Sequence, residues 1–286
     1  MASVRDIKRR IRSVKNTQQI TKAMEMVSAA KLRRTQGAVI AARPYAAKLE
    51  EVLSRLVASS GTLKDPLLEM REPQKIGFVV LSADRGLSGG YNANLIKTAV
   101  ASMARHKEQE IGIITIGKKA RDFFKKRNYR VEGEFIGIAD IPTQHEAQEI
   151  TDAVKAFYTE GIYDEVYITY TEFITAMQQK PVTKRILPIE TPANEEGGGE
   201  LDYIFDPNPQ MVLNQLLPLY LNNLVFSALM EAKASEHGAT MTAMGSATDN
   251  AGEMIDKLTL TYNRARQAAI TREITEIVGG ASALEG

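Results

Sequence analysis

The chain contains no cysteine, and this absence removes several kinds of chemistry together. Disulfide bonds, thiolate nucleophiles and metal sites with cysteine ligands are all excluded. No run of about 18 apolar residues occurs, so we expect no membrane-spanning helix. The first residues are basic but lack an apolar core, so they do not resemble a secretory signal, and we expect an intracellular protein.

Net charge is almost absent as well. The 36 Lys and Arg residues against 35 Asp and Glu residues leave a formal charge of +1. The total charge therefore gives no indication of nucleic-acid binding. What is present is a composition typical of a folded protein, over 286 residues, which is enough for one or two domains.

The longest pattern is helical and fills most of residues 208–286. Asn208 suits an N-cap, and Pro209 suits the first helical position, where no intrahelical bond is lost. No loop signal follows until the Gly-Gly pair at 279–280. At about 1.5 Å per residue, a helix over this span would be roughly 100 Å long. Because Pro218 and several glycines weaken it, we expect it to need a partner helix.

Residues 1–60 predict that partner, a second long helix beginning near Ser3. Its apolar residues fall in two offset stripes, and the offset predicts a broken heptad near Gln18, while Pro44 predicts a kink or break. The first stripe is Ile7, Ile11 and Val14, and the second is Ile20, Met24 and Val27. Because neither long helix has another place to bury its stripe, we predict an antiparallel coiled coil of the two chain ends.

The C-terminal helix has its own predicted seam, with spacings that alternate between three and four residues. Its positions are Met244, Ala247, Ala251, Met254, Leu258, Thr261, Ala265 and Ala268. Most of these side chains are small, so the partner helix could approach closely.

A different pattern occupies residues 75–195 and predicts an inserted α/β domain. Short apolar runs alternate with helical segments, which predicts a largely parallel, Rossmann-like sheet. The expected strands are 76–81, 111–117, 131–136 and 164–170, with a further edge strand at 182–189.

We find no catalytic, cofactor or metal constellation in this domain. The loop at 84–90 (DRGLSGG) follows a strand and opens a helix, where phosphates bind, but it matches neither a dinucleotide fingerprint nor a Walker A motif. We interpret it as a structural turn. The three histidines, His106, His145 and His237, lack metal-ligand spacing, so we expect surface positions for them.

The N-terminal helix carries a basic face, with ten Lys or Arg residues against two acids over residues 1–34. Three interpretations stay open: a solvated helix face, a nucleic-acid arm, or a surface for an acidic protein partner. Aromatic residues for base stacking are absent from this stretch, which disfavours the nucleic-acid arm.

Five segments together resemble the γ subunit of F-type ATP synthase, bacterial type. They are residues 11–27 (IRSVKNTQQITKAMEMV), 84–90, 235–239 (SEHGA), 262–271 (YNRARQAAIT) and 273–281 (EITEIVGGA). They occur in that family's order and spacing along the whole chain. Ser88 stands where many members carry Cys. The regulatory dithiol insert of the plastid form is missing, and we expect no transit peptide.

The resemblance implies a non-catalytic central-stalk rotor subunit without a cofactor. Such a subunit couples rotation of the c-ring of Fo to ATP synthesis or hydrolysis at β subunits. Implied partners are the α3β3 ring of F1, the ε subunit and the c-ring, with no nucleic acid. Implied localisation is peripheral, on the cytoplasmic face of the bacterial cell membrane.

The resemblance also implies residue roles. Arg266 and Gln267 would contact a β-subunit loop, although they could simply be an exposed pair. Met24 would face β, although it could equally lie in the seam. The apolar tip of the shaft would be Ile277, Val278, Ala281 and Leu284, and a candidate contact with the c-ring or ε would be Tyr203, Phe205 and Asp206.

Two other functions stay open at this point. One is a nucleotide-binding enzyme on the central α/β domain, which tight ATP binding by the isolated chain would support. The other is a nucleic-acid-binding coiled-coil protein, which a steep salt dependence of DNA affinity would support.

Overall fold

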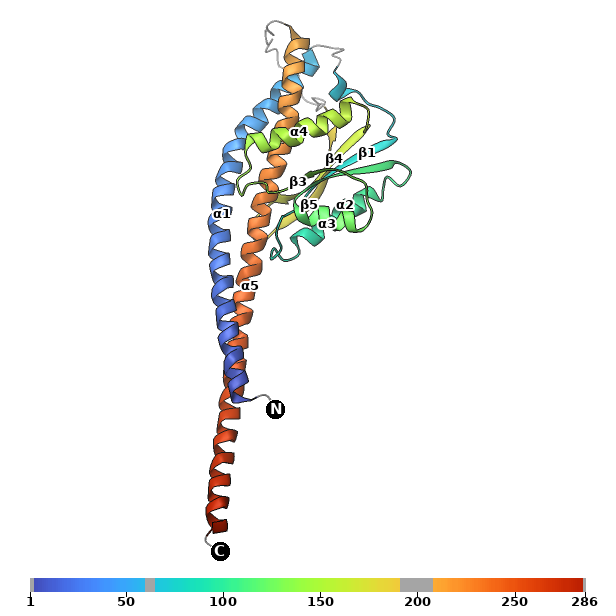
Figure 1. Ribbon diagram of the computed structural model, residues 1–286. Helices are drawn as coiled ribbons and strands as arrows, with labels where there is room; N and C mark the ends of the chain where they lie inside the picture. Colours follow the sequence, from blue (N-terminus) through green and yellow to red (C-terminus); the bar gives the residue numbers. More distant parts are fainter. Residues whose placement is uncertain (1–2, 60–64, 191–207, 285–286) are drawn as a thin grey trace. The chain divides into compact units, whose positions relative to one another are not determined.

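The computed structural model describes residues 3–59, 65–190 and 208–284. Long helices begin and end the chain, and a sheet with shorter helices lies between them in sequence (Figure 1). The elements are α1 (Val4–Ser59), η1 (Pro66–Leu68), β1 (Lys75–Leu81), α2 (Tyr91–Met103), β2 (Glu110–Ile116), α3 (Lys118–Lys126), β3 (Val131–Phe135), α4 (Gln144–Thr159), β4 (Glu165–Phe173), β5 (Gln179–Leu187) and α5 (Pro209–Leu284). The predicted α/β class with long terminal helices is confirmed.

The chain divides into two compact units. The smaller unit consists of residues 1–27 and 241–286, and the larger consists of residues 28–240. Both α1 and α5 contribute to each unit, so neither unit is a continuous stretch of sequence.

The sheet of the larger unit has the order β3-β2-β1-β4-β5. β1, β2, β3 and β4 are parallel, and β5 pairs antiparallel with β4 at the edge. β1 is buried along almost its whole length, as expected for a central strand covered on both faces. The chain order reverses beside β1, which in such sheets is the switch point where ligands usually bind.

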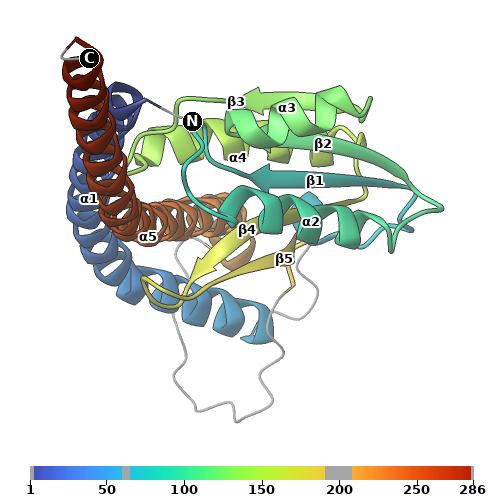
Figure 2. The same cartoon turned by 90° about the horizontal axis from the view of Figure 1, so that it is seen from below.

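Helices cover both faces of the sheet. On one face, Phe78 and Val80 of β1 pack with Leu95 of α2 and Phe124 of α3. On the other face, Val79 and Leu81 pack with α4 and with the first half of α5. Figure 2 shows this layered arrangement from below. The first half of α5 is therefore a core helix of the larger unit.

The ends and interiors of the long helices follow their local chemistry. Ser3 Oγ accepts a hydrogen bond from the Asp6 N–H at 3.2 Å, and Asn208 Oδ1 accepts one from the Met211 N–H at 2.9 Å, so both predicted caps are present. α1 continues through Pro44 and α5 through Pro218, so the predicted break at Pro44 is wrong. The Gly-Gly pair at 279–280 does not end α5 either, because the helix runs on to Leu284.

By length and composition alone, α5 is apolar enough over Pro209–Ala281 to cross a membrane. Although Met211 and Leu219 of this helix are exposed, many of its apolar residues in the larger unit are fully buried in the protein core. They include Leu213, Leu217, Leu221 and Val225. This burial accounts for the apolar composition without a lipid environment.

Candidate functional site

In the smaller unit the start of α1 packs against the second half of α5. Buried or half-buried positions recur on α1 with alternating spacings of three and four residues. They are Val4, Ile7, Ile11, Val14, Gln18, Thr21 and Glu25. The predicted break of the heptad near Gln18 is therefore wrong, because polar side chains occupy the seam there. Two residues of the predicted second stripe point outward instead, Ile20 at 60% and Val27 at 54% exposure, whereas Met24 is half-buried.

The seam of α5 also differs in part from the prediction. The buried or half-buried series is Met244, Thr248, Ala251, Ile255, Leu258, Tyr262, Ala265 and Ala269. The predicted Met254, Thr261 and Ala268 are exposed, while half-buried Ala247 flanks the series. The predicted and the observed series both have spacings that alternate between three and four residues, and they share four residues. The residues alone could not decide the phase, because both series mix small and apolar side chains in similar proportion.

A polar layer joins the two helices. The Gln18 amide donates a hydrogen bond to the Thr248 carbonyl at 3.4 Å, and the hydroxyls of Thr21 and Thr248 lie 2.8 Å apart. A Cβ at Gly252 would lie 3.2 Å from the Gln18 amide nitrogen, and one at Gly245 would lie 3.6 Å from the Glu25 carboxyl carbon. The glycines therefore leave room for polar side chains, which can fix the register of a helix pair.

These contacts confirm antiparallel pairing within the smaller unit. Gln18 lies beside Gly252, and Glu25 lies beside Gly245, so seven residues forward on α1 match seven residues back on α5. Continued to Val4, this register ends near residue 266. The remainder of α5 runs past the start of α1, and all its described side chains from 271 to 281 are exposed (Figure 1).

The residues proposed to contact β lie at two levels of this helix pair. Met24 is half-buried at the edge of the seam, whereas Arg266 and Gln267 are exposed. By the register, Met24 lies level with about residue 246, so the two levels are separated by roughly 30 Å along α5. The structure does not bring them together, and their roles stay predictions.

The predicted tip residues lie on the unpaired end of α5. Ile277 is 71% and Val278 58% exposed, Ala281 is exposed, and Leu284 is the last residue of the helix. Two further apolar side chains, Ile270 and Ile274, are exposed on the same stretch. Tyr203, Phe205 and Asp206 lie outside the described residues.

At the switch point of the sheet, the polar groups bond other parts of the chain and so stabilise the fold. Asp84 accepts hydrogen bonds from the Lys118 N–H at 3.0 Å and the Gly137 N–H at 2.9 Å. Ser82 Oγ accepts one from the Ala120 N–H at 2.8 Å. Ser88 Oγ lies 3.2 Å from the donating amide of Asn92, whose oxygen accepts from the Ala83 N–H. The interpretation of this loop as a structural turn is supported.

Helix α5 fills the crevice beside this loop. Ala232, Lys233 and Glu236 of α5 face Ser82 and Asp84 across a void of only about 10 Å³. The Tyr91 hydroxyl, where α2 begins, donates to the Ala232 carbonyl at 3.1 Å. The place where a doubly wound sheet usually holds a nucleotide is thus occupied by the chain itself.

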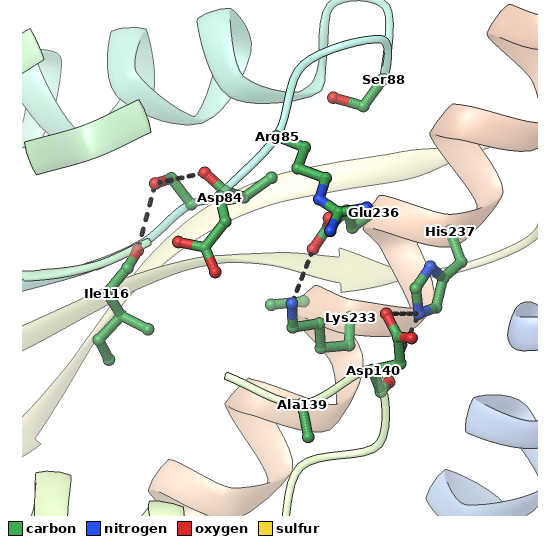
Figure 3. Close-up of polar contacts among 12 residues, drawn as sticks. Asp84, Arg85, Ser88, Ile116, Ala139, Asp140, Lys233, Glu236 and His237 are labelled. Atoms are coloured by element: carbon green, nitrogen blue, oxygen red, sulfur yellow. Dashed lines mark hydrogen bonds and ion pairs between the residues drawn. The ribbon is translucent and has the colours of Figure 1, made fainter. Parts of the chain in front are cut away.

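A polar cluster next to this crevice ties α1 and α5 to the β3–α4 loop, and Figure 3 shows the contacts that α5 contributes to it. The carboxylate of Asp140 lies 2.8 Å from Lys31 Nζ and 3.8 Å from His237 Nε2, and Lys233 pairs with Glu236 at 3.2 Å. Burial by itself would raise the pKa of Asp140, but the hydrogen bond and charge of Lys31 outweigh it, so this pKa lies below its ordinary value.

The prediction of surface histidines fails for His237, which is 5% exposed. Burial lowers its pKa, against the opposing influence of Glu236 and Asp140. His145 is exposed as expected, and His106 is half-buried against Phe78 and Tyr167. No sequence signal marks the His237–Asp140 contact, because the two residues are 97 positions apart.

Comparison with known proteins covers the whole chain. The family model described as ATP synthase matches residues 3–284. The chain is similar to the ATP synthase gamma chain of Pelotomaculum thermopropionicum, with 50% identity, and to that of Moorella thermoacetica, with 53% identity. In both cases the match covers 100% of this chain and 100% of the relative.

Among solved structures, the fold resembles a chain of the Euglena gracilis mitochondrial ATP synthase, OSCP/F1/c-ring, with a TM-score of 0.73. That match has 20% identity and covers 98% of this chain and 94% of the other. A chain of the Tetrahymena thermophila central stalk/c-ring structure matches with a TM-score of 0.60 and 22% identity, over 80% of this chain and 99% of that one. At these identities the likeness concerns the fold.

Proposed function

Because this chain belongs to the gamma-chain family of ATP synthase, as its full-length match shows, we propose that it is the central-stalk rotor of the F1 sector. In this role it transmits c-ring rotation to the β subunits, where ATP is made or hydrolysed. It does no chemistry itself.

The observation that carries the proposal is the bare end of α5. A helix that continues past its partner with every described side chain from 271 to 281 exposed gains no stability from the chain's own core. Isoleucines are nevertheless kept at 270, 274 and 277. Apolar residues in such a place serve a contact with another protein. We assign that contact to an apolar collar of the α3β3 ring, with Ile277, Val278, Ala281 and Leu284 at the tip.

The mechanism follows from asymmetry. A pair of helices has no threefold symmetry, so it cannot contact three equivalent β subunits in the same way. A partner shifts a conformational equilibrium only through contacts that differ between states. Met24 at one level and Arg266 with Gln267 at another supply such contacts in this proposal. Rotation of the pair then presents them to each β subunit in turn.

Charge supports the same partner. The Lys and Arg side chains over residues 5–15 are all exposed, and only Arg9 has an ion pair with another described residue, Asp6 at 2.9 Å. Such a face suits acidic loops of β. The ε subunit and the c-ring are the further proposed partners, with Tyr203, Phe205 and Asp206 as the candidate contact. Through them the chain would sit at the cytoplasmic face of the cell membrane.

Reconstitution tests the proposal. Purified chain is mixed with α and β subunits of the same source, and assembly and ATP hydrolysis are measured. We expect a stable complex that hydrolyses ATP faster than α and β alone, and no hydrolysis by the isolated chain. A ring that neither binds the chain nor changes its rate would refute the proposal, and ATP turnover by the chain alone would refute its non-catalytic role.

A further inference from the structure

The larger unit contains a cavity that the rotor function does not use. It has a volume of about 430 Å³, which is within the range of small-molecule sites. Its walls come from α1 between Val39 and Glu50, from β4 and β5, and from α5 between Tyr220 and Glu231. All of these segments belong to one compact unit. The cavity therefore lies within a single compact unit.

One buried polar side chain in this wall lacks a partner. Asn223 of α5 is 6% exposed and lines the cavity. No hydrogen bond joins its side chain to another residue in the part of the chain that the structure describes. Its amide lines the cavity, so a molecule bound there could supply the hydrogen bonds that polar groups of protein interiors usually make.

Some charged side chains that line the cavity form ion pairs with other residues, and some do not. Lys184 Nζ pairs with Glu172 at 2.6 Å, and Arg185 pairs with both Glu165 and Glu190. Glu50 and Glu231, by contrast, form no ion pair with any described residue. Glu231 is half-buried, and burial together with the nearby Glu172 charge raises its pKa, although the charges of Lys184 and Arg43 and a hydrogen bond from the Phe173 backbone act in the opposite direction. Lys184 and Arg43 therefore offset the cost of this half-buried carboxylate only in part, and the wall can accept a further positive charge beside it.

The two unpaired carboxylates lie toward opposite ends of the cavity. Glu50 is close enough to Tyr220 to influence its pKa, so it lies near the Tyr220 level of α5. Glu231 is eleven positions further along that helix, or about 16 Å at the rise of an α-helix. A ligand that meets both would be long and carry a charge at each end.

We propose that this cavity binds a linear polyamine, with one terminal ammonium at Glu231, the other toward Glu50, and the chain between them against Tyr170, Tyr220 and Asn223. Arg43, an exposed base of the α1 wall with no ion pair to a described residue, opposes the ligand by its charge. Its removal should therefore strengthen binding, which a purely structural role for these residues would not produce.

Isothermal titration of the purified full chain with putrescine, spermidine and spermine tests the proposal. We expect saturable binding that strengthens with chain length. Glu231→Gln should weaken spermidine binding at least tenfold, since charge-assisted hydrogen bonds are about twice as strong as neutral ones. The same change at exposed Glu149 of α4 should leave it unaltered. Arg43→Ala should tighten spermidine binding several-fold, and thermal unfolding checks that each variant is folded.

Several results would overturn the proposal. One is the absence of saturation at millimolar spermidine, and another is equal binding by Glu231→Gln and the parent chain. Succinate, the anionic probe, should not bind. If it binds and Arg43→Ala abolishes this binding, the cavity is an anion site. If Glu231→Gln does not fold, an unchanged or weaker affinity of Arg43→Ala for spermidine decides against the polyamine.

Discussion

Gly117 shows how a single backbone position keeps the crevice of the sheet closed. It has a φ of +89°, and a Cβ there would lie 2.1 Å from the Ser82 carbonyl oxygen. That carbonyl belongs to the loop after β1, and the adjacent Ser82 hydroxyl holds α3 through the Ala120 N–H. The residue therefore allows β2, α3 and the loop to approach closely without space for a ligand.

Replacement of Gly117 by alanine should destabilise the protein strongly. The left-handed backbone costs about 1–2 kcal/mol, and the clash with backbone atoms should add roughly 2 kcal/mol. Gly137→Ala is the matched control, because Gly137 also has positive φ, +78°, but nothing lies within 4 Å of its Cβ position. Urea denaturation measures both. Equal losses of unfolding free energy would show that the close approach at Gly117 is unimportant.

His237 makes the stability of the larger unit depend on pH. Its folded pKa lies below the ordinary value for histidine, so the unfolded chain binds the proton more readily. This contribution is complete above about pH 6.5 and is lost as pH falls toward the folded pKa. Asp140, whose pKa is lowered from a carboxyl value, loses its contribution only at more acidic pH.

We therefore expect the unfolding free energy to fall between pH 7 and pH 5 and to fall less in His237→Gln. The exposed His145 provides the control, and His145→Gln should keep the slope of the parent chain. Chemical denaturation at several pH values gives both slopes. Equal slopes for all three proteins would contradict the assignment to His237.

At the scale of elements, sequence patterns predicted nearly all helices and strands. The strands of the sheet have continuous apolar runs, as at 76–81, and the glycines and polar turns between them are strong local signals. The paired helices were predicted less well in detail. Ile20, Val27 and Met254 looked like seam residues by type, yet they point outward, while Gln18, Thr21 and Thr248 lie inside.

The reason is that an apolar residue indicates burial within its own chain only where it serves no contact with another protein. In the smaller unit the seam combines apolar residues such as Ile11 and Ile255 with hydrogen bonds and glycines, and other apolar side chains face outward. The contact of buried His237 with exposed Asp140 was unpredictable for another reason, since tertiary contacts between distant segments leave no local pattern. The candidate site residues of the smaller unit came from family resemblance, not from periodicity.

A double-mutant cycle can measure the energetic coupling between the two threonine hydroxyls in the polar layer of this helix pair. Each hydroxyl also lies within hydrogen-bond distance of a carbonyl of its own helix, Gln18 for Thr21 and Met244 for Thr248, so the hydroxyl that donates across the pair gives up its own carbonyl. Replacement of both by valine should therefore be mild, with a coupling energy of about 0.5–1.5 kcal/mol between the hydroxyls. Zero coupling in urea unfolding would mean that the 2.8 Å contact adds nothing to the pairing.

Substitutions at the unpaired end of α5 should affect the function of the complex without affecting the stability of the chain. Ile277 is 71% exposed, so Ile277→Asp should change the unfolding free energy by no more than about 0.5 kcal/mol. In complexes with α and β, however, it should weaken assembly or slow ATP hydrolysis, because a charge would enter an apolar contact. Thr275→Asp adds the same charge on another face of the helix. Identical effects of both variants would contradict a one-sided apolar contact for Ile277.

For the molecule as a whole, one chain combines a helix pair whose seam includes a polar layer and an α/β unit whose ligand crevice is filled by α5. The outward apolar side chains of the smaller unit suit contacts with other subunits. The role in ATP synthase is therefore mechanical in this account, and mechanical coupling is its central claim.

Single-molecule rotation tests that claim most directly. A probe is attached to the larger unit of this chain, and α3β3 complexes containing it are fixed to a surface and supplied with ATP. The account predicts that the probe turns in one direction and pauses at three evenly spaced angles in each revolution, because the three β subunits are equivalent. A probe that stays still while the same complexes hydrolyse ATP would contradict it.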